Sequence, residues 1–339
     1  NGYIHVKAIP GAPDELLSRA GYLADRVSIN LELPTAQSLS KLAPNKSFKT
    51  ILEPMEKITR KIAANRPTLE KDAQMERSSI NRYLTGSIFN QNGTDNGQAA
   101  LSGTQRTALE SGDKLSLPAV SKDMCVKRPF APAGQSTQMI IGATPETDLT
   151  LIRTTQHLYK NYDLKRVFYS AYIPLNEDSA LPQLDADVPL LREHRLYQAD
   201  WLLRFYGFQA DELLSESRPN FNEQLDPKCD WAIRHLGQFP IEVQNASYDM
   251  LLRIPGIGPK SARRIVETRR YAKLDFDILK KIGVVLKRAH YFITCNGRMM
   301  YRIPIEESYI TSCLTDDNHK ENWEITHQNE KYQQLSLFE

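Results

Sequence analysis

Cysteine is scarce in this sequence, and the cysteines that occur are far apart. The four are Cys125, Cys229, Cys295 and Cys313, at separations of 104, 66 and 18 residues. Zinc and iron–sulfur sites draw on cysteines that lie a few residues apart, so these spacings predict no metal site in the chain. They also exclude a small scaffold held together by disulfides.

Long apolar runs are missing as well. No stretch approaches the roughly 18 apolar residues that a membrane-spanning helix needs, and no basic segment followed by an apolar one precedes the first strand-like segment. We therefore expect a cytoplasmic protein with no membrane partner. Because the chain opens at Asn1 and not at a methionine, we also expect a fragment whose natural start lies upstream.

The length and the charge distribution suggest two regions with different tasks. A chain of 339 residues is longer than one ordinary domain, so we expect two units. The net charge is only +2, yet residues 251–303 contain thirteen Lys or Arg against three Asp or Glu, a net +10. A basic block of this density is typical of a nucleic-acid surface, although a solvated helical face is the alternative.

The first half alternates strand-like and helix-like segments. Residues 4–9 and 26–31 alternate as strands do, and Pro13 opens a helical segment between them. Residues 51–62 place apolar side chains on one helical face. Two more strands follow at 138–142 and 166–173, and this rhythm predicts parallel α/β architecture.

Several boundaries follow from local composition. Between the last two strands, Thr144 is expected to cap a helix that has Pro145 at its first position. Residues 85–118 are rich in Asn, Gly, Gln, Ser and Thr, which predicts a flexible insertion within a first domain at 1–185. An all-α domain at 186–305 and a loosely ordered tail at 306–339 complete the expected organisation.

The strongest local signal lies at residues 251–266, where two helical patterns are joined by Pro255-Gly256-Ile257-Gly258. This arrangement resembles the helix-hairpin-helix motif. The glycines permit a tight turn with exposed amides, and amides at a helix N-terminus bind phosphate. The residues expected to contact DNA are Gly256, Ile257, Gly258, Lys260, Ser261, Arg263 and Arg264. The alternative is a glycine-rich turn that only joins two helices.

Two further observations attach to this motif. Residues 279–284 are a weaker echo of it and are expected to form a pseudo-symmetric second motif. In helix-hairpin-helix DNA glycosylases, a lysine after the hairpin and an aspartate some twenty residues later act on the sugar, and Lys260 and Asp277 are similarly placed. The simpler interpretation, which we favour, is that Lys260 contacts phosphate and Asp277 caps the following helix.

Residues 2–11, 25–35, 132–148 and 169–174, together with the hairpin, resemble one family. It comprises the DNA modification or repair radical S-adenosylmethionine (SAM) proteins that are associated with uracil-DNA-glycosylase-like partners. The resemblance implies a partial (βα)6 barrel, a 4Fe-4S cluster, cleavage of SAM to a radical and a nucleic-acid substrate. The family's CxxxCxxC motif does not occur here, so the cluster ligands are expected upstream of Asn1.

Within the barrel, polar residues near the carboxyl ends of strands are the candidates, because parallel barrels place their active sites there. The residues expected to bind SAM are Ser28, Asn30, Glu32, Ile141, Gly142 and Ala143. His5 and Lys7 share a strand face and are weaker candidates for substrate contact. The alternative for each is a polar group satisfied inside or at the rim of the barrel.

The last residues contain a short peptide, Gln334-Leu335-Ser336-Leu337-Phe338. It looks like the peptide by which bacterial DNA-processing proteins dock into the sliding clamp. Gln334, Leu335, Leu337 and Phe338 are the expected contacts, with the apolar side chains as anchors. The alternative is an amphipathic end that folds back on its own domain.

Three hypotheses result. The first is a radical SAM enzyme acting in DNA modification or repair, with the helical domain holding the duplex. The second is a non-catalytic DNA-binding scaffold that recruits a uracil-DNA-glycosylase-like partner. The third is a glycosylase or lyase that uses Lys260.

Overall fold

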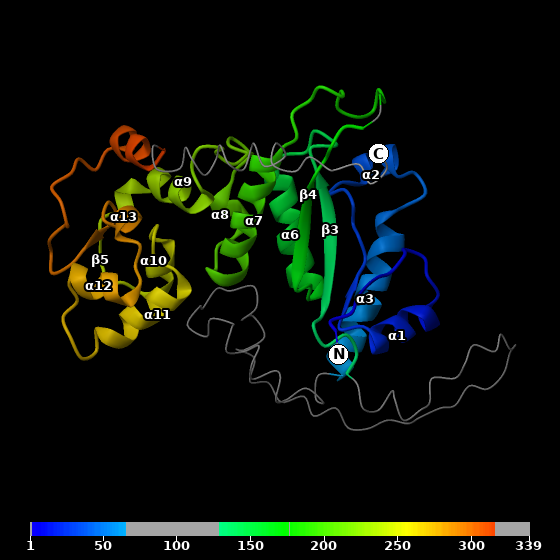
Figure 1. The fold of residues 1–339 in the computed structure, drawn as a ribbon, viewed down its shortest axis with the longest axis horizontal. Helices are drawn as coiled ribbons and strands as arrows, with labels where there is room; N and C mark the ends of the chain where they lie inside the picture. The colour runs from blue at the N-terminus through cyan, green and yellow to red at the C-terminus, as the bar shows by residue number, and fades with distance from the viewer. Residues whose placement is uncertain (1, 66–128, 176, 316–339) are drawn as a thin grey trace, which may run out of the picture.

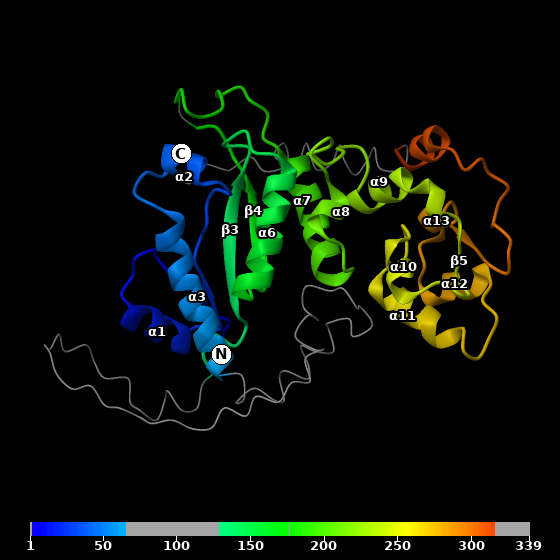
Figure 2. The ribbon, with the colours of Figure 1, turned by 180° about the vertical axis from the view of Figure 1, so that it is seen from behind.

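The computed structural model describes residues 2–65, 129–175 and 177–315. A parallel sheet with its helices lies toward one end of the molecule, and a group of short helices lies at the other (Figure 1). The view from behind shows the same separation (Figure 2). We call residues 2–65 and 129–175 the sheet half, and residues 206–315 the helical half.

The sheet half is built on four parallel strands in the spatial order β1-β2-β3-β4. They are β1 (His5–Lys7), β2 (Arg26–Ser28), β3 (Gln135–Ile141) and β4 (Arg166–Ala171). The predicted parallel α/β architecture is confirmed, although β1 and β2 are shorter than the pattern suggested. Among the described residues this sheet is open, so the (βα)6 barrel stays a prediction.

Helices cover one face of the sheet. They include α1 (Asp14–Leu23), α3 (Phe48–Asn65) and α6 (Asp148–Tyr162), while the short α2 (Ala36–Leu42) follows β2. Gln135 marks the covered face, because its side-chain amide donates to the carbonyls of Met55 (3.1 Å) and Tyr162 (2.8 Å). Val27 pairs with Gln135 in register and is fully buried on that face. Ser28 and Ser136, the next pair, point to the opposite face.

The start of α6 differs from the prediction. Its N-cap is Thr147, whose hydroxyl accepts from the Thr150 N–H (3.3 Å), and not Thr144. The Thr144 hydroxyl instead donates to the Glu146 carboxylate, as does the Ser38 hydroxyl from α2. Thr144 and Thr147 both offer a hydroxyl that could cap the helix, so the local sequence does not separate them. In the fold, Thr144 is bonded to Glu146, which also accepts from Ser38 of α2.

Helix α7 (Leu190–Phe205) joins the two halves. The Tyr197 hydroxyl accepts from the Tyr169 N–H of β4 (3.0 Å) and donates to the Tyr169 carbonyl (2.8 Å). The buried Asp200 pairs with Arg204 (2.7 Å) and accepts from the Tyr159 hydroxyl of α6. These bonds fix α7 against the sheet, and its far end leads directly into the helical half.

The helical half consists mainly of short helices. They are α8 (Ala210–Leu213), α9 (Pro227–Arg234), the 3-10 turn η2 (Leu236–Gln238), α10 (Tyr248–Arg253), α11 (Pro259–Thr268), α12 (Phe276–Ile282) and α13 (Leu286–Ala289). The all-α prediction was wrong in one respect, because β5 (Ile241–Glu242) and β6 (Ile293–Thr294) form a parallel pair. Two-residue strands are too short to leave an alternating pattern in the sequence.

The end of the described chain is more ordered than predicted. Residues 307–315 are helical, and Ile310 and Leu314 are buried against the core. The tail expected from residue 306 therefore begins with a packed helix. The predicted insertion at 85–118 lies outside the described residues. None of the helices in the described parts of the chain is long and apolar enough to cross a membrane.

Candidate nucleic-acid interface

The turn between α10 and α11 is fixed by local sequence. The Ser247 hydroxyl caps α10 by accepting from the Met250 N–H (3.1 Å). Pro255 and the glycines that follow end that helix, and Gly256 adopts φ +81°, a left-handed conformation that favours glycine. Pro259 then occupies the first position of α11, where its missing N–H costs nothing. We call residues 254–258 the hairpin.

Close packing explains why Gly256 has no side chain. A Cβ atom at this position would lie 2.5 Å from the Val285 carbonyl oxygen and 3.1 Å from the Ala289 nitrogen. The Gly256 carbonyl in turn accepts from the Val285 N–H (2.9 Å). The hairpin is therefore pressed directly onto the turn that precedes α13.

That second turn matches the predicted echo of the motif. Helix α12 ends at Gly283, which has φ +99°, and α13 follows within three residues. The Ser261 hydroxyl of α11 donates to the Gly283 carbonyl (2.9 Å), and the Arg264 guanidinium donates to the Ile282 carbonyl (2.9 Å). The two turns thus pack as one unit, joined by side chains of α11.

A buried lysine supports the hairpin from behind. Lys228, on α9, is 8% exposed, and its Nζ donates to the Ile257 carbonyl at 2.6 Å. The same Nζ lies 4.6 Å from the centre of the Tyr206 ring, a favourable position for a cation over an aromatic face. Burial, opposed by the nearby Asp226, lowers the pKa of Lys228 to about 7.

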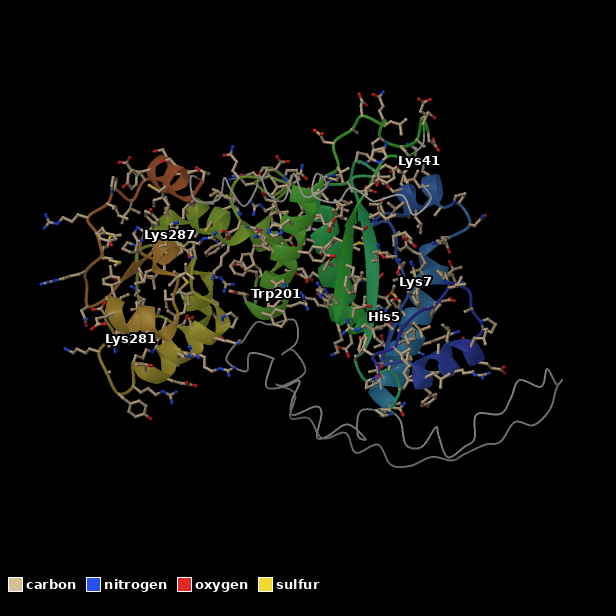
Figure 3. All side chains as sticks on the ribbon, viewed as in Figure 1. His5, Lys7, Lys41, Trp201, Lys281 and Lys287 are labelled. Carbon is tan, nitrogen blue, oxygen red and sulfur yellow. The ribbon has the colours of Figure 1, made fainter. Side chains whose placement is uncertain are left out.

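The outer side of this unit offers donors and positive charge. The first amides of α11 have no acceptor within the helix, as at every helix N-terminus, and the helix dipole adds to their attraction for an anion. Lys260 and Arg264 on α11 and Lys281 on α12 are exposed. Within the described residues none of these three forms an ion pair. In Figure 3, Lys281 and Lys287 lie in the helical half, away from His5 and Lys7.

Part of the basic block serves the fold instead. Arg253 makes two bonds to Glu212 of α8, at 2.7 and 3.0 Å. Arg288 pairs with Asp226 at 3.2 Å, and Arg269 donates to the carbonyls of Val243 and Ala246. The charge available to a partner is therefore smaller than the net +10 of the segment.

The residues predicted to bind DNA separate into three groups. Gly256 and Gly258 shape the hairpin, and Lys260 and Arg264 are exposed beside it, with Arg263 half-buried. The Ile257 side chain is buried in the core, so only its backbone is at the turn. Ser261 is 7% exposed and its hydroxyl bonds to the second turn.

The lysine and aspartate suggested by the glycosylase comparison lie on different helices. Lys260 is in the first turn of α11, and Asp277 is exposed in the first turn of α12. The N-cap of α12 is Asp275, whose carboxylate accepts from the Ile278 N–H (2.7 Å), so the expected cap at Asp277 was wrong. The extended backbone at Asp275 precedes the first helical residue, Phe276, which leaves Asp277 inside the helix.

The predicted SAM contacts at and beyond the end of β2 are buried or paired with neighbouring side chains. Asn30 is 5% exposed, and its amide donates to the Gln138 side chain (3.2 Å). Glu32 adopts φ +67° just beyond the strand and pairs with Lys46 at 3.2 Å. Ser28 lies two residues before Asn30 and is also buried.

The predicted contacts at the end of β3 are buried or partly buried. Ile141 and Ala143 are buried, at 1% and 5% exposure. Gly142 has φ +87°, and a Cβ there would lie 2.7 Å from a ring carbon of Pro189. The space beside this glycine is therefore filled by the residue that precedes α7.

His5 and Lys7 are exposed on β1, an edge strand of the described sheet. Partial burial, with the nearby Arg26, lowers the pKa of His5. The residues of the predicted clamp peptide, Gln334, Leu335, Leu337 and Phe338, lie outside the described residues.

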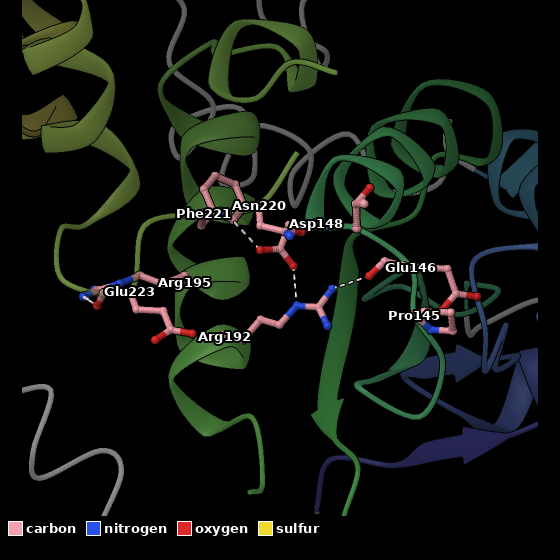
Figure 4. Close-up of a pocket in the computed structure, with 9 residues that line it drawn as sticks. Pro145, Glu146, Asp148, Arg192, Arg195, Asn220, Phe221 and Glu223 are labelled. Atoms are coloured by element: carbon pink, nitrogen blue, oxygen red, sulfur yellow. Dashed lines mark hydrogen bonds and ion pairs between the residues drawn. The ribbon is translucent and has the colours of Figure 1, made fainter. Parts of the chain in front are cut away.

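A cavity of about 260 Å³ lies where α6, α7 and the loop 219–223 meet (Figure 4). Its central ion pair joins Arg192 to Asp148 (2.6 Å), and the other Asp148 oxygen accepts from the Phe221 N–H (3.0 Å). The Arg192 guanidinium also donates to the Glu146 carbonyl. These bonds hold the two halves together, and we assign the cavity no ligand.

The described residues do not provide a metal site. No group of three His, Cys, Asp or Glu in ranges 2–65, 129–175 and 177–315 has an arrangement that would hold a metal ion. The described cysteines, Cys229, Cys295 and Cys313, all lie in the helical half as free thiols. The described part of the chain therefore does not fit a 4Fe-4S cluster.

Comparison with known proteins points to the same part of the chain as the geometry. Residues 241–268 match the helix-hairpin-helix motif. No curated protein and no solved structure matches the chain. The matched range runs from β5 through the hairpin to the end of α11, which confirms the predicted motif and supports DNA binding. The radical SAM barrel and its partners stay predictions.

Sequence reasoning missed Lys228, Asp226 and Tyr206. They precede the hairpin by more than twenty residues and reach it only through folding. A single lysine in a helical segment gives no pattern that would separate it from a solvated one. The only sequence signal is Asp226-Pro227, which marks the start of α9 but does not indicate what Lys228 contacts.

Proposed function

We propose that the helical half binds DNA through its phosphate backbone, with the hairpin and the first turn of α11 as the contact. The observation that carries this proposal is the hairpin itself, which joins free helix-terminal amides to the exposed Lys260 and Arg264 within the matched motif. Contacts of this kind fix position and do not read base sequence. Binding is therefore expected to be largely independent of sequence and strongly dependent on salt.

The test is the salt dependence of affinity for two short duplexes of unrelated sequence. The variant Lys260→Ala is expected to weaken binding to both by about fivefold and to reduce the salt slope by about 0.9, the value for one phosphate contact. Lys41→Ala is the matched control, since Lys41 is an exposed lysine in the sheet half, far from the hairpin (Figure 3). Equal behaviour of the two variants would contradict the assignment.

For the sheet half we propose a role in SAM chemistry. The support is the resemblance together with a polar row, Ser28, Asn30, Ser136 and Gln138, on the face of the parallel sheet opposite α3 and α6. SAM, bound with a reduced cluster supplied by upstream residues, would provide a radical. Asn30 and Glu32 would hold its polar ends. Isothermal titration of SAM into the wild type and Asn30→Ala tests this, and equal affinities would contradict it.

The alternative proposal is a DNA-binding scaffold for a uracil-DNA-glycosylase-like protein. Three upstream cysteines at CxxxCxxC spacing would favour the enzyme over the scaffold. Formation of 5′-deoxyadenosine from SAM that duplex DNA stimulates would also favour the enzyme. No formation would favour the scaffold.

Two narrower proposals have tests of their own. A lyase that uses Lys260 predicts a covalent adduct with abasic DNA after borohydride treatment, and its absence would remove that reading. Docking of residues 334–338 into the sliding clamp predicts that deletion of the last six residues abolishes affinity for the purified clamp. Unchanged affinity would contradict it.

A further inference from the structure

A buried charged group of the helical half lies on the inner side of the hairpin, where it cannot touch DNA. Lys228 is 8% exposed, whereas Lys260 on the outer side of the same turn is exposed. A buried ammonium is costly unless its charge is compensated, so its position calls for an explanation beyond solubility.

The contacts of Lys228 connect it to the phosphate site by one peptide unit. Its Nζ donates to the Ile257 carbonyl at 2.6 Å, and the nitrogen bonded to that carbonyl carbon belongs to Gly258. Gly258 is the N-cap of α11. An ammonium on the carbonyl oxygen polarises this peptide and makes its N–H a stronger donor to an anion.

The groups around the ammonium come from four elements. Asp226 and the Cys229 thiol belong to the same helix start, and Tyr206 follows α7. Arg253 from α10 and Arg288 from α13 bring positive charge, but each is paired, with Glu212 and Asp226 respectively. Since Asp226 is shared with Arg288 and with two N–H groups of α9, it compensates the ammonium only in part.

We propose that DNA binding at the hairpin is coupled to the uptake of a proton by Lys228, which acts as a positioning residue for the phosphate site. This inference rests on the proposed DNA-binding function. A phosphate at the start of α11 adds the negative charge that the buried ammonium lacks, so the bound state favours the charged form. The neutral amine holds the Ile257 carbonyl less strongly and adds no charge behind the amides.

The sign of the pH dependence follows. Burial lowers the pKa of Lys228 to about 7 in the free protein, and a bound phosphate raises it. Affinity for DNA is therefore highest below pH 7, where both states carry the proton. The affinity falls as pH rises through 7, by at most about tenfold per pH unit. It levels off above the pKa that Lys228 has in the complex.

The experiment is calorimetric titration of a short duplex into the wild-type protein at about pH 7.7, in two buffers with different ionisation enthalpies. The difference in apparent enthalpy gives the number of protons taken up. We expect uptake of roughly half a proton per complex. Binding without proton uptake would overturn the inference. No binding of DNA at any pH would overturn the proposed function as well, and the two results are distinguishable.

Variants assign the proton to its residue. Lys228→Met is expected to bind more weakly at pH 6.5, to lose most of the uptake and to keep or raise its melting temperature, because a buried charge is removed. His290→Gln is the control, since His290 follows α13, whose Ala289 lies against Gly256, and its Nδ1 bonds to the Leu286 carbonyl (2.7 Å). Loss of uptake in His290→Gln instead of Lys228→Met would contradict the assignment.

Discussion

The polar groups of the two halves are used in opposite ways. On the face of the sheet opposite α3 and α6, Ser28, Asn30 and Ser136 are buried, and the Asn30 amide donates to Gln138. The glycine after β3 is covered by Pro189. Beside the hairpin, Lys260 is exposed in the first turn of α11, next to the helix-terminal amides, and within the described residues it forms no ion pair. Exposed charge next to helix-terminal amides distinguishes the hairpin from the polar side chains of the sheet.

The same contrast applies within the basic block. Arg253, Arg269 and Arg288 hold elements of the helical half together, so their charge is committed to the fold. Lys260 is exposed on α11 with no such contact among the described residues, whereas Arg264 is exposed but also donates to the Ile282 carbonyl (2.9 Å). Counting charges along the sequence identifies the correct region but overestimates how many of them face a partner.

The largest expected effect is at the hairpin glycine. Gly256→Ala forces a left-handed conformation on alanine and brings its Cβ within 2.5 Å of a backbone carbonyl oxygen. We therefore expect the free energy of unfolding to fall by roughly 4 kcal/mol and DNA binding to be lost. Gly258→Ala is the control, because its nearest contact is the Tyr206 hydroxyl at 3.5 Å. Thermal unfolding measures both, and equal melting temperatures would contradict the packing described here.

A core substitution in the sheet half sharpens the comparison. Met139 is fully buried, and Met139→Ala is expected to cost about 3 kcal/mol through lost burial and a cavity. DNA affinity, measured well below the melting temperature, is expected to stay unchanged because the hairpin does not contact β3. A parallel loss of affinity would show that the halves do not act separately.

A smaller effect is expected from Glu242, which anchors the β5–β6 pair. Burial opposes its ionisation, but N–H donors of Gly297, Gln244 and Asn296 and the Thr294 hydroxyl outweigh it and lower its pKa. The stability it contributes is complete above the ordinary glutamate pKa and is lost as pH falls through the lowered one. Melting temperatures between pH 7 and about pH 3 are expected to converge for the wild type and Glu242→Gln, and a constant gap would contradict this.

The smallest expected effect concerns Asn30, one of the residues predicted to bind SAM. Asn30→Ala removes one hydrogen bond to Gln138, so the expected loss of stability is about 1 kcal/mol, with DNA affinity unchanged. Chemical denaturation and duplex titration measure the two quantities. Weaker DNA binding in this variant would place nucleic acid on the sheet and break the division between the halves.

Local signals explain which features the sequence revealed. Pro255, Gly256 and Pro259 act on their own backbone, so the turn and the start of α11 were predictable. The cap at Thr147, the filling of Gly142 by Pro189 and the bond from Lys228 to Ile257 depend on segments that meet only in the fold. A sequence pattern carries no record of such contacts, which is why the helix-hairpin-helix motif was predictable but its buried support was not.

The most direct test of the account is amide hydrogen exchange with and without duplex DNA. The account predicts protection of residues 256–262 in the complex, since the phosphate would bond to amides of the hairpin and α11, and no change at residues 26–32 and 135–142. Protection confined to the sheet segments, with the hairpin unchanged, would contradict the central claim that the helical half holds DNA.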